Sequence, residues 1–143
     1  PIHSSAASDV YKRQALGTAR AHTMARAGTL SRHGIAFALH SDYTMSPAQP
    51  LNSAWVAVNR KNVAGDIVGT EERISVEQAL RAITIDAAYV LGLEHEVGTL
   101  QPGKRADFTV LEQDPLEVPP EDLRDIKIWG TVFGGMPAPL KDN

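Results

Sequence analysis

The sequence of 143 residues contains no cysteine. Disulfide bonds, thiolate metal sites and a cysteine nucleophile are therefore excluded. Aromatic residues are also few, at 6% of the chain, whereas the hydrophobic residues together reach 43%. A hydrophobic fraction of this size suits a packed core, so the composition indicates a globular chain rather than a disordered one.

The chain also has no excess of basic residues over acidic residues. The formal net charge is −3, and acidic and basic residues are interspersed. The chain has no basic stripe to neutralise phosphates and no polybasic patch to hold anionic lipids, which argues against nucleic acid and membrane surfaces as partners. No apolar run approaches the roughly 20 residues that a membrane-spanning helix needs.

The first segment, residues 1–14, is polar and lacks hydrophobic periodicity. It has no apolar central region of the kind that a secretory signal requires. Its stretch SDVYKRQ is similar to translated adapter sequence, so we interpret 1–14 as a non-native segment, with a disordered natural N-terminus as the alternative. We divide the rest of the chain into two parts, 15–92 with β/α character and 93–143 with β character.

Two helices and one strand are expected in the first half of the chain. Residues 18–33 combine alanine, leucine and methionine with arginine, and Gly34 follows as a typical residue at a helix end. Residues 51–59 carry apolar side chains at helical spacing. Between these helices, Ile35 to Leu39 is apolar on both faces, which predicts a buried parallel strand.

A third helix is expected to begin after Ser75. Ser75 and Gln78 match a capping box, and an apolar face follows over four turns until Gly92. Beyond this helix, Gln-Pro-Gly at 101–103 specifies a type II turn. Strands are then predicted over 106–111 and 126–133, with a helical turn at 121–125 between them.

Polar side chains follow the first predicted strand directly. His40, Ser41, Asp42 and Tyr43 come at its carboxyl end, where β/α barrels place their chemistry. A carboxylate there can bind a cation and take a proton from an attacking water. The alternative is that Asp42 starts a turn through its side chain, and the spacing alone favours this alternative. In an extended segment the side chains of His40 and Asp42 would point to the same side.

Further metal ligands are not evident in the sequence. A catalytic zinc normally takes three protein ligands, and the chain has neither His-x-His nor HExxH. His22, His33 and His95 are expected to be solvated or capping residues, and Trp55 and Trp129 to be packing residues. The sequence also has no GxSxG motif and no phosphate-binding loop, which argues against a serine hydrolase and a nucleotide-binding protein.

Several stretches occur in an order that resembles the C-terminal end of the amidohydrolase superfamily. These stretches are FALHSDYTMSP, SVEQALRAITIDAAYVLGL, VGTLQPGKRADFTVLEQDP and a strand ending in TVFGG. The block GTLQPGKRADFTVLE is specific, with a Pro-Gly-Lys turn and an Ala-Asp pair that opens a strand. The likeness runs from about residue 16 to the end of the chain. It is nearest to the amidohydrolase-3 group, which is similar to N-substituted formamide deformylases.

The resemblance implies the last β/α unit of a metal-dependent (β/α)8 barrel, followed by the C-terminal part of a small composite β-sandwich. It implies that Asp42 binds a divalent metal, usually zinc, and shuttles a proton from the attacking water to the leaving nitrogen. His40, Ser41 and Tyr43 would line the pocket. The family's other metal ligands lie upstream of the residues present here, so the resemblance predicts an incomplete fragment that depends on the missing N-terminal part of the same protein.

The parent protein is thus expected to be a metal-dependent hydrolase that acts on C–N bonds of a small-molecule amide, N-formyl or cyclic amide substrate. The fragment alone is expected to be inactive. The alternative is a non-catalytic α/β packing or binding module in which Asp42 is a turn residue. Substrate identity, one versus two metals, oligomeric state and compartment are left open by the sequence.

Overall fold

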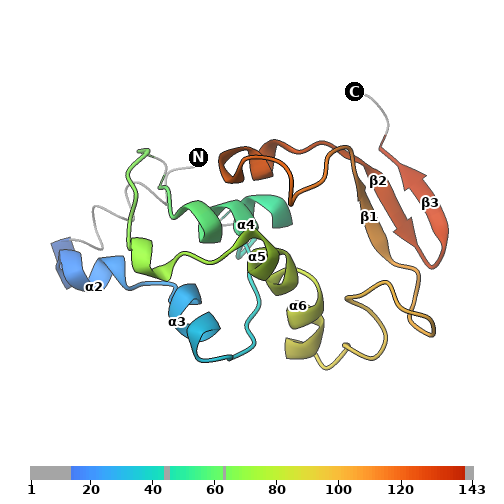
Figure 1. Ribbon diagram of the computed structural model, residues 1–143, viewed down its shortest axis with the longest axis horizontal. Helices are drawn as coiled ribbons and strands as arrows, with labels where there is room; N and C mark the ends of the chain where they lie inside the picture. The colour runs from blue at the N-terminus through green and yellow to red at the C-terminus, as the bar shows by residue number, and fades with distance from the viewer. Residues whose placement is uncertain (1–13, 44–45, 63, 141–143) are drawn as a thin grey trace.

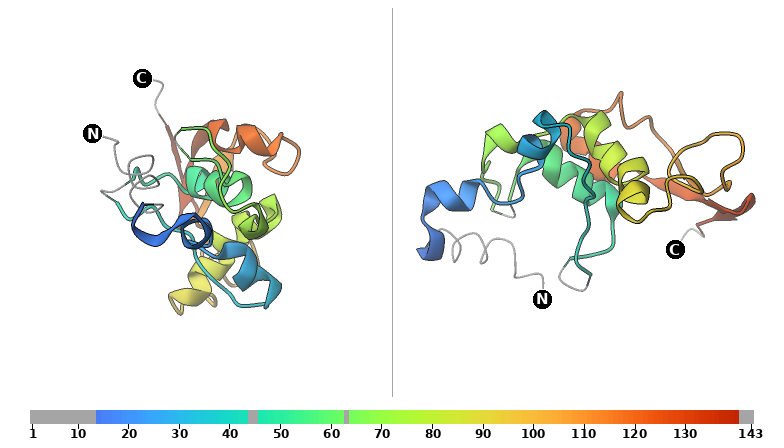
Figure 2. Two further views of the ribbon diagram at one scale, coloured as in Figure 1. Left: turned by 90° about the vertical axis from the view of Figure 1, so that its left-hand side faces the viewer. Right: turned by 90° about the horizontal axis from the view of Figure 1, so that it is seen from below.

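A computed structural model describes residues 14–43, 46–62 and 64–140. The molecule is elongated, with α2 at one end, a three-stranded antiparallel sheet at the other and the remaining helices between them (Figures 1 and 2). The helices are α2 (Thr18–His22), α3 (Ala27–Arg32), α4 (Pro50–Asn59), the 3-10 helix η1 (Thr70–Glu72), α5 (Val76–Ala82), α6 (Ile85–Val90) and the 3-10 helix η2 (Pro120–Asp125). The strands are β1 (Phe108–Leu111), β2 (Ile128–Phe133) and β3 (Met136–Pro139). Within the described residues, no helix has the length and apolar character needed to cross a membrane.

The prediction of one continuous helix over 18–33 is wrong, because the structure has two. α2 ends at His22, α3 begins at Ala27, and Ala25 between them has a φ of 52°. The guanidinium of Arg60 donates to the carbonyl oxygens of Ala25 at 3.1 Å and of His22 at 3.2 Å. A distant side chain therefore binds carbonyl groups that a continuous helix would have used for its own hydrogen bonds.

Glycines end α3 and α6, as predicted. After α3, Gly34 has a φ of 64°, and its N–H donates to the carbonyl oxygen of Ser31 at 3.0 Å. The N–H of Ile35 donates to the carbonyl oxygen of Leu30 at 3.0 Å. These two bonds form a Schellman motif, which needs a residue with positive φ at its centre. Gly92, with a φ of 71°, takes the same position after α6.

The capping box predicted at Ser75 is confirmed. The Ser75 hydroxyl accepts the N–H of Gln78 at 3.1 Å, and the Gln78 side-chain oxygen accepts the N–H of Ser75 at 2.8 Å. The prediction of one continuous helix beyond it is wrong, because the helix is interrupted at Thr84, between α5 and α6. The Thr84 hydroxyl donates to the carbonyl oxygen of Leu80 at 2.7 Å, and this bond to the preceding turn competes with a straight helix.

The predicted strand from Ile35 to Leu39 does not form. Its residues join no sheet among the described parts of the chain. Instead, the N–H of Leu39 donates to the carbonyl oxygen of Ala82 in α5 at 3.1 Å, and the half-buried Phe37 and Leu39 pack against the core. A parallel strand needs a neighbour for its backbone groups, and the sheet that is present is antiparallel. The segment is thus held in place by α5 and the core.

The antiparallel sheet follows the predicted strands and adds one more. β1 and β2 lie within the predicted ranges, η2 is the predicted helical turn, and Gly103 has the φ of 91° that a type II turn requires. The sequence does not predict β3, which contains Pro137 and Pro139, and proline is rare in strands. It lies at the edge of the sheet, where proline is tolerated. Gly134 and Gly135, with φ of 56° and 81°, form the hairpin turn before it.

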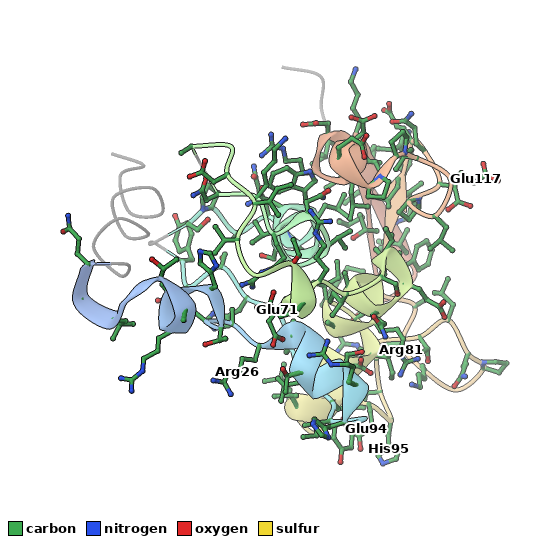
Figure 3. All side chains as sticks on the ribbon, turned by 60° about the vertical axis from the view of Figure 1, so that its left-hand side comes forward. Arg26, Glu71, Arg81, Glu94, His95 and Glu117 are labelled. Atoms are coloured by element: carbon green, nitrogen blue, oxygen red, sulfur yellow. The ribbon has the colours of Figure 1, made fainter. Side chains whose placement is uncertain are left out.

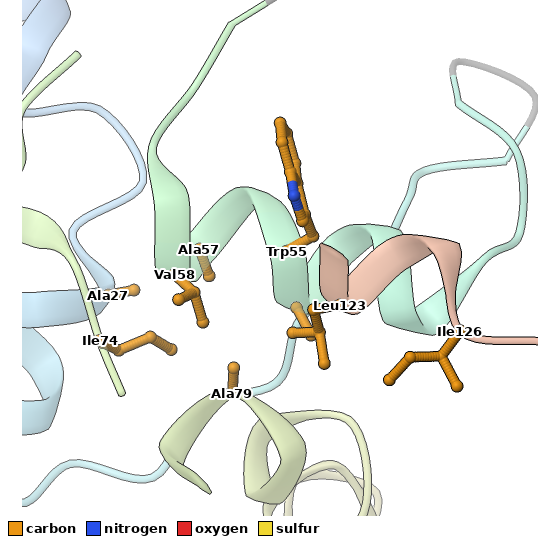
Figure 4. Close-up of a cluster of buried hydrophobic side chains, with 9 residues drawn as sticks. Ala27, Trp55, Ala57, Val58, Ile74, Ala79, Leu123 and Ile126 are labelled. Atoms are coloured by element: carbon orange, nitrogen blue, oxygen red, sulfur yellow. The ribbon is translucent and has the colours of Figure 1, made fainter. Parts of the chain in front are cut away.

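The core lies where α4 faces α5 and η2 (Figure 4). Leu123 of η2 is fully buried, and Trp55 of α4 is 6% exposed. The indole N–H of Trp55 donates to the carbonyl oxygen of Glu121 at 2.6 Å, which fastens η2 to α4. Packing is thus confirmed for Trp55, whereas Trp129 is 46% exposed. The buried residues of the cluster are Ala27, Ala54, Trp55, Ala57, Val58, Ile74, Ala79, Leu123 and Ile126.

A buried carboxylate joins α3 to η1. Glu72 is 3% exposed, and its carboxylate accepts the N–H of Thr29 at 2.7 Å and the Thr29 hydroxyl at 2.5 Å. The hydrogen bond from the Thr29 hydroxyl is the main reason why the pKa of Glu72 lies below its ordinary value, although burial alone would raise it. Thr29 belongs to the first turn of α3, so Glu72 caps this helix from a distant segment.

We expect Glu72→Ala to lower the free energy of unfolding by about 2 kcal/mol, because the N–H and hydroxyl of Thr29 both lose their charged acceptor. Because folding lowers the pKa of Glu72, this stabilisation is fully present above the unfolded pKa and is lost as the pH falls through the folded pKa. Urea unfolding should therefore show a difference between the two proteins that shrinks in acid. The exposed neighbour Glu71 supplies the control, and a similar loss in Glu71→Ala would contradict the assignment.

Candidate functional site

His40 and Asp42 form a tight turn at the end of the 35–39 segment. The backbone N–H of Asp42 donates to Nδ1 of His40 at 3.1 Å. The φ of Asp42 is 51°, in the left-handed region that aspartate and asparagine enter more readily than most residues. No hydrogen bond among the described residues uses the Asp42 carboxylate, so this group is available for chemistry even though the residue makes a turn.

All four predicted site residues lie at or near the surface of the described chain. His40 and Asp42 are exposed, Ser41 is half-buried, and Tyr43 is 75% exposed. The structure brings His40 and Asp42 together through the backbone of Asp42, and it shows no such contact for Ser41 or Tyr43 within the described residues. The roles of these residues as ligand or pocket-lining groups remain predictions.

A divalent metal would find one suitable carboxylate in this turn. Among residues 14–43, 46–62 and 64–140, no three side chains of histidine, aspartate or glutamate converge on one point. A catalytic zinc normally takes three protein ligands. The described residues therefore do not form a complete zinc site, and the role of Asp42 as a metal ligand stays a prediction.

Of the other histidines, His95 is at the surface and His33 is a capping residue, as expected, whereas His22 is half-buried and is the last residue of α2. The side chain of His95 is 91% exposed, and its Nε2 lies 3.4 Å from the carboxylate of Glu94; both residues lie near the surface (Figure 3). His33 is the C-cap residue of α3. His22 ends α2 and offers its carbonyl oxygen to Arg60. None of these three histidines joins a metal cluster in the described chain.

One hollow lies beside the segment that leads to the turn. It has a volume of about 240 Å³, and Ile35 and Phe37 form part of its wall. Its lining also includes the ion pair of Arg81 and Asp86, whose charged atoms are 2.9 Å apart. Residues 40–43 do not line this hollow, so it is not a ready-made pocket around Asp42.

Another hollow is a groove of about 620 Å³ between α6, the loop after α6 and β1. Its walls are largely apolar and include Ala87, Leu91, Leu100 and Phe108. The hydroxyl of Thr99 is buried at this groove and has no hydrogen-bond partner among the described residues. This surface is mainly hydrophobic, and its polar lining residues are Thr84, Thr99, Asp107 and Thr109.

The block GTLQPGKRADFTVLE, which carries much of the resemblance, holds the C-terminal part together. The ammonium group of Lys104 donates to the carbonyl oxygen of Glu94. Asp107 accepts the N–H of Gly134 at 2.7 Å and pairs with the guanidinium of Arg105 at 2.6 Å. These contacts fasten the turn before β1 and the hairpin between β2 and β3. The block is therefore a structural element of the described chain.

A model of the amidohydrolase family matches residues 2–138. The chain is 32% identical to an N-substituted formamide deformylase from Arthrobacter pascens over 103 residues, which cover 72% of this chain and 19% of that protein. It is 33% identical to the putative amidohydrolase YtcJ from Bacillus subtilis (strain 168) over 123 residues, or 84% of this chain and 23% of that one. It is 35% identical to an imidazolonepropionase from Acinetobacter baumannii (strain AB0057) over 91 residues, or 63% and 21% of the two chains.

The chain thus spans about a fifth of the length of these relatives. Its fold resembles part of the crystal structure of an amidohydrolase from Thermotoga maritima MSB8, with a TM-score of 0.56 and 21% identity, over 77% of this chain and 25% of that one. At this identity the likeness concerns the fold alone. The match to the family model covers nearly the whole sequence, and on this ground the chain belongs to the amidohydrolase family.

Proposed function

We propose that this chain is the C-terminal part of a metal-dependent amidohydrolase in which Asp42 is a metal ligand and proton carrier. The observation that carries the proposal is that Asp42 follows an apolar segment in a chain of the amidohydrolase family. Its exposed carboxylate, not hydrogen-bonded to any described residue, follows an apolar segment that α5 and the core hold in place. Because the chain spans about a fifth of its relatives, the remaining ligands would come from other parts of a longer protein.

The proposed substrate is a small molecule with a carbonyl carbon bound to nitrogen, such as an amide, an N-formyl compound or a cyclic amide. The names of two relatives support this class: one protein is a deformylase of N-substituted formamides, and another is an imidazolonepropionase. In each case the bond to be broken joins carbon to nitrogen. Asp42 would face the nitrogen of that bond.

In the complete protein, we propose that Ile35–Leu39 pairs as the last strand of a (β/α)8 barrel. Residues 15–92 would end the barrel, and 93–143 would form part of a composite β-sandwich. The half-buried, apolar character of the segment supports this, as does its one backbone hydrogen bond to α5, which leaves other backbone groups for strand neighbours. The apolar groove along β1 offers a surface for the missing part of the same protein.

In this proposal the chemical role of Asp42 is to move a proton. Hydrolysis joins the oxygen of water to the carbonyl carbon and breaks the C–N bond. The Asp42 carboxylate accepts the proton that the attacking water gives up, and it then delivers this proton to the leaving nitrogen, so that it ends as a carboxylate again. The resemblance implies that this protein binds a divalent cation, usually zinc. Such a cation would polarise the carbonyl group of the substrate and lower the pKa of the water molecule that it binds.

Metal removal tests this function. We expect a complete protein that contains this segment to hydrolyse an N-formyl amine, and to lose at least about a hundredfold in rate after dialysis against a chelator. The rate should return when zinc is added. Release of formate and the metal content per protein are the two measurements. Undiminished hydrolysis by a protein that holds no metal would contradict the proposal.

A second candidate applies to the 143 residues alone, namely a non-catalytic packing or binding module in which Asp42 serves the turn. The lack of a three-ligand cluster among the described residues favours it for the isolated chain. Zinc binding tests this second candidate, because a packing module is expected to bind zinc weakly. Tight zinc binding at one ion per isolated chain would contradict the packing module.

A further inference from the structure

We propose that His40 is a positioning residue for Asp42, acting through Nδ1 as a hydrogen-bond acceptor. The inference rests on the proposed function of Asp42. The observation behind it is the contact of 3.1 Å between Nδ1 of His40 and the backbone N–H of Asp42. Asp42 has a φ of 51°, so the contact is made to a residue in the left-handed conformation.

The contact reproduces a known turn with an unusual acceptor. In an Asx turn, the side-chain oxygen of asparagine or aspartate accepts the N–H of the residue two positions later. In His40, Nδ1 occupies the place of that oxygen, one bond beyond Cγ. The left-handed conformation costs free energy for most residues other than glycine, and the hydrogen bond from Asp42 offsets part of this cost.

The proposed role requires one state of the imidazole ring. An Nδ1 that accepts a hydrogen bond carries no hydrogen, so the neutral ring has its hydrogen on Nε2. The Nδ1 lone pair used in the turn is not available to a metal. His40 therefore supports the site by shaping the backbone at Asp42, and binding a metal through Nδ1 would break the turn.

Two hydrogen bonds then hold the backbone that carries the Asp42 side chain. One is the bond of 3.1 Å from the N–H of Leu39 to the carbonyl oxygen of Ala82, which holds the segment before the turn. The other is the bond between His40 and Asp42, which closes the turn itself. Without the second bond, the backbone at Asp42 is free to leave the left-handed region. Small displacements of a reacting group lower turnover steeply, because the reaction depends on near-ideal distances.

The first test is the tautomer of His40 in the 143-residue chain. Long-range ¹H–¹⁵N spectra, recorded at a pH where the ring is neutral, should show the Nε2–H tautomer for His40 and an Nδ1 shift typical of an acceptor. His40→Asn should keep the Asp42 amide shift near its original value, and His40→Leu should move it. A His40 that carries its hydrogen on Nδ1, or an Asp42 amide unmoved by His40→Leu, would overturn the positioning role.

The second test is kinetic and uses a complete protein that contains this segment. His40→Leu is expected to lower kcat about tenfold with little change in KM. His40→Asn should restore most of the rate, because its side-chain oxygen can rebuild the turn. His95→Leu, at a histidine whose side chain is 91% exposed, is the matched control and should be neutral. Equal losses in His40→Asn and His40→Leu, or no loss in His40→Leu, would refute the inference.

Failure of the proposed function would look different. In that case Asp42→Asn would retain full hydrolysis, while the Nε2–H tautomer of His40 and the amide shift of residue 42 would still report an intact turn. Failure of the positioning role leaves Asp42→Asn inactive and removes only the dependence on His40. The two variants together therefore identify which of the two statements is wrong.

Discussion

Asp42→Asn is expected to lower the turnover of a complete protein by about a thousandfold or more, with the fold intact. Asparagine has nearly the same size as aspartate and also tolerates the left-handed region, so the φ of 51° remains accessible. The backbone N–H that donates to His40 is unchanged. The substitution thus removes a proton carrier and an anionic ligand without disturbing the turn that presents them.

The measurement is kcat for hydrolysis of an N-formyl amine, together with a circular dichroism spectrum that checks the fold. Asp125→Asn makes the same chemical change at a side chain that is 71% exposed and whose paired guanidinium, that of Arg124, lies 3.9 Å away. This control should keep the original rate. Turnover of Asp42→Asn close to that of the original protein would show that another group carries the proton.

Leu123→Ala is expected to destabilise the chain by about 3 kcal/mol, the second largest effect. Leu123 is fully buried and brings η2 into the cluster formed with α4 and α5 (Figure 4). Ala54 and Ala79 of the same cluster are also fully buried, and side chains this small cannot move in to fill the space left by leucine. The cost therefore combines lost burial with a cavity that stays open.

Urea unfolding monitored by tryptophan fluorescence measures this loss. The buried Trp55 is a direct reporter, because its indole N–H bonds to the carbonyl oxygen of Glu121 in η2. Leu116→Ala removes the same atoms from a side chain that is 63% exposed, so its effect on the free energy of unfolding should stay below about 0.5 kcal/mol. Similar midpoints for the two variants would contradict the packing account.

Features that depend on neighbours in the chain could be predicted from the sequence. The capping box of Ser75 and Gln78 requires residues three positions apart, and both of its hydrogen bonds are present. Gly34 and Gly103 have the positive φ that a helix end and a type II turn demand. In each case a short rule fixes the backbone, so a local pattern is sufficient.

Features that depend on distant residues could not be predicted in this way. The break at Ala25 follows from Arg60, and the cap on α3 comes from Glu72. Neither partner leaves a local signal, because each lies more than 30 residues away along the chain, at separations of 35 and 43. The apolar run from Ile35 to Leu39 has the composition of a strand, but a strand also needs a partner, which the described chain does not supply.

The candidate site was predictable only in part, for the same reason. The position of Asp42 after an apolar segment, taken alone, favours a turn residue. Its assignment as a site residue comes from the resemblance and stays a prediction. An extended backbone would have placed His40 and Asp42 side by side as two ligands. The left-handed conformation of Asp42 instead turns its N–H toward His40. The role of His40 as an acceptor thus depends on one backbone angle that no spacing rule gives.

The contacts of Lys104, Arg105 and Asp107 have an evolutionary consequence. They fasten a turn and a hairpin, and none of them reaches the turn at Asp42. Selection for a stable C-terminal hairpin would therefore preserve them in a descendant that had abandoned catalysis. The presence of this block therefore reports a stable C-terminal hairpin and carries no information on catalysis.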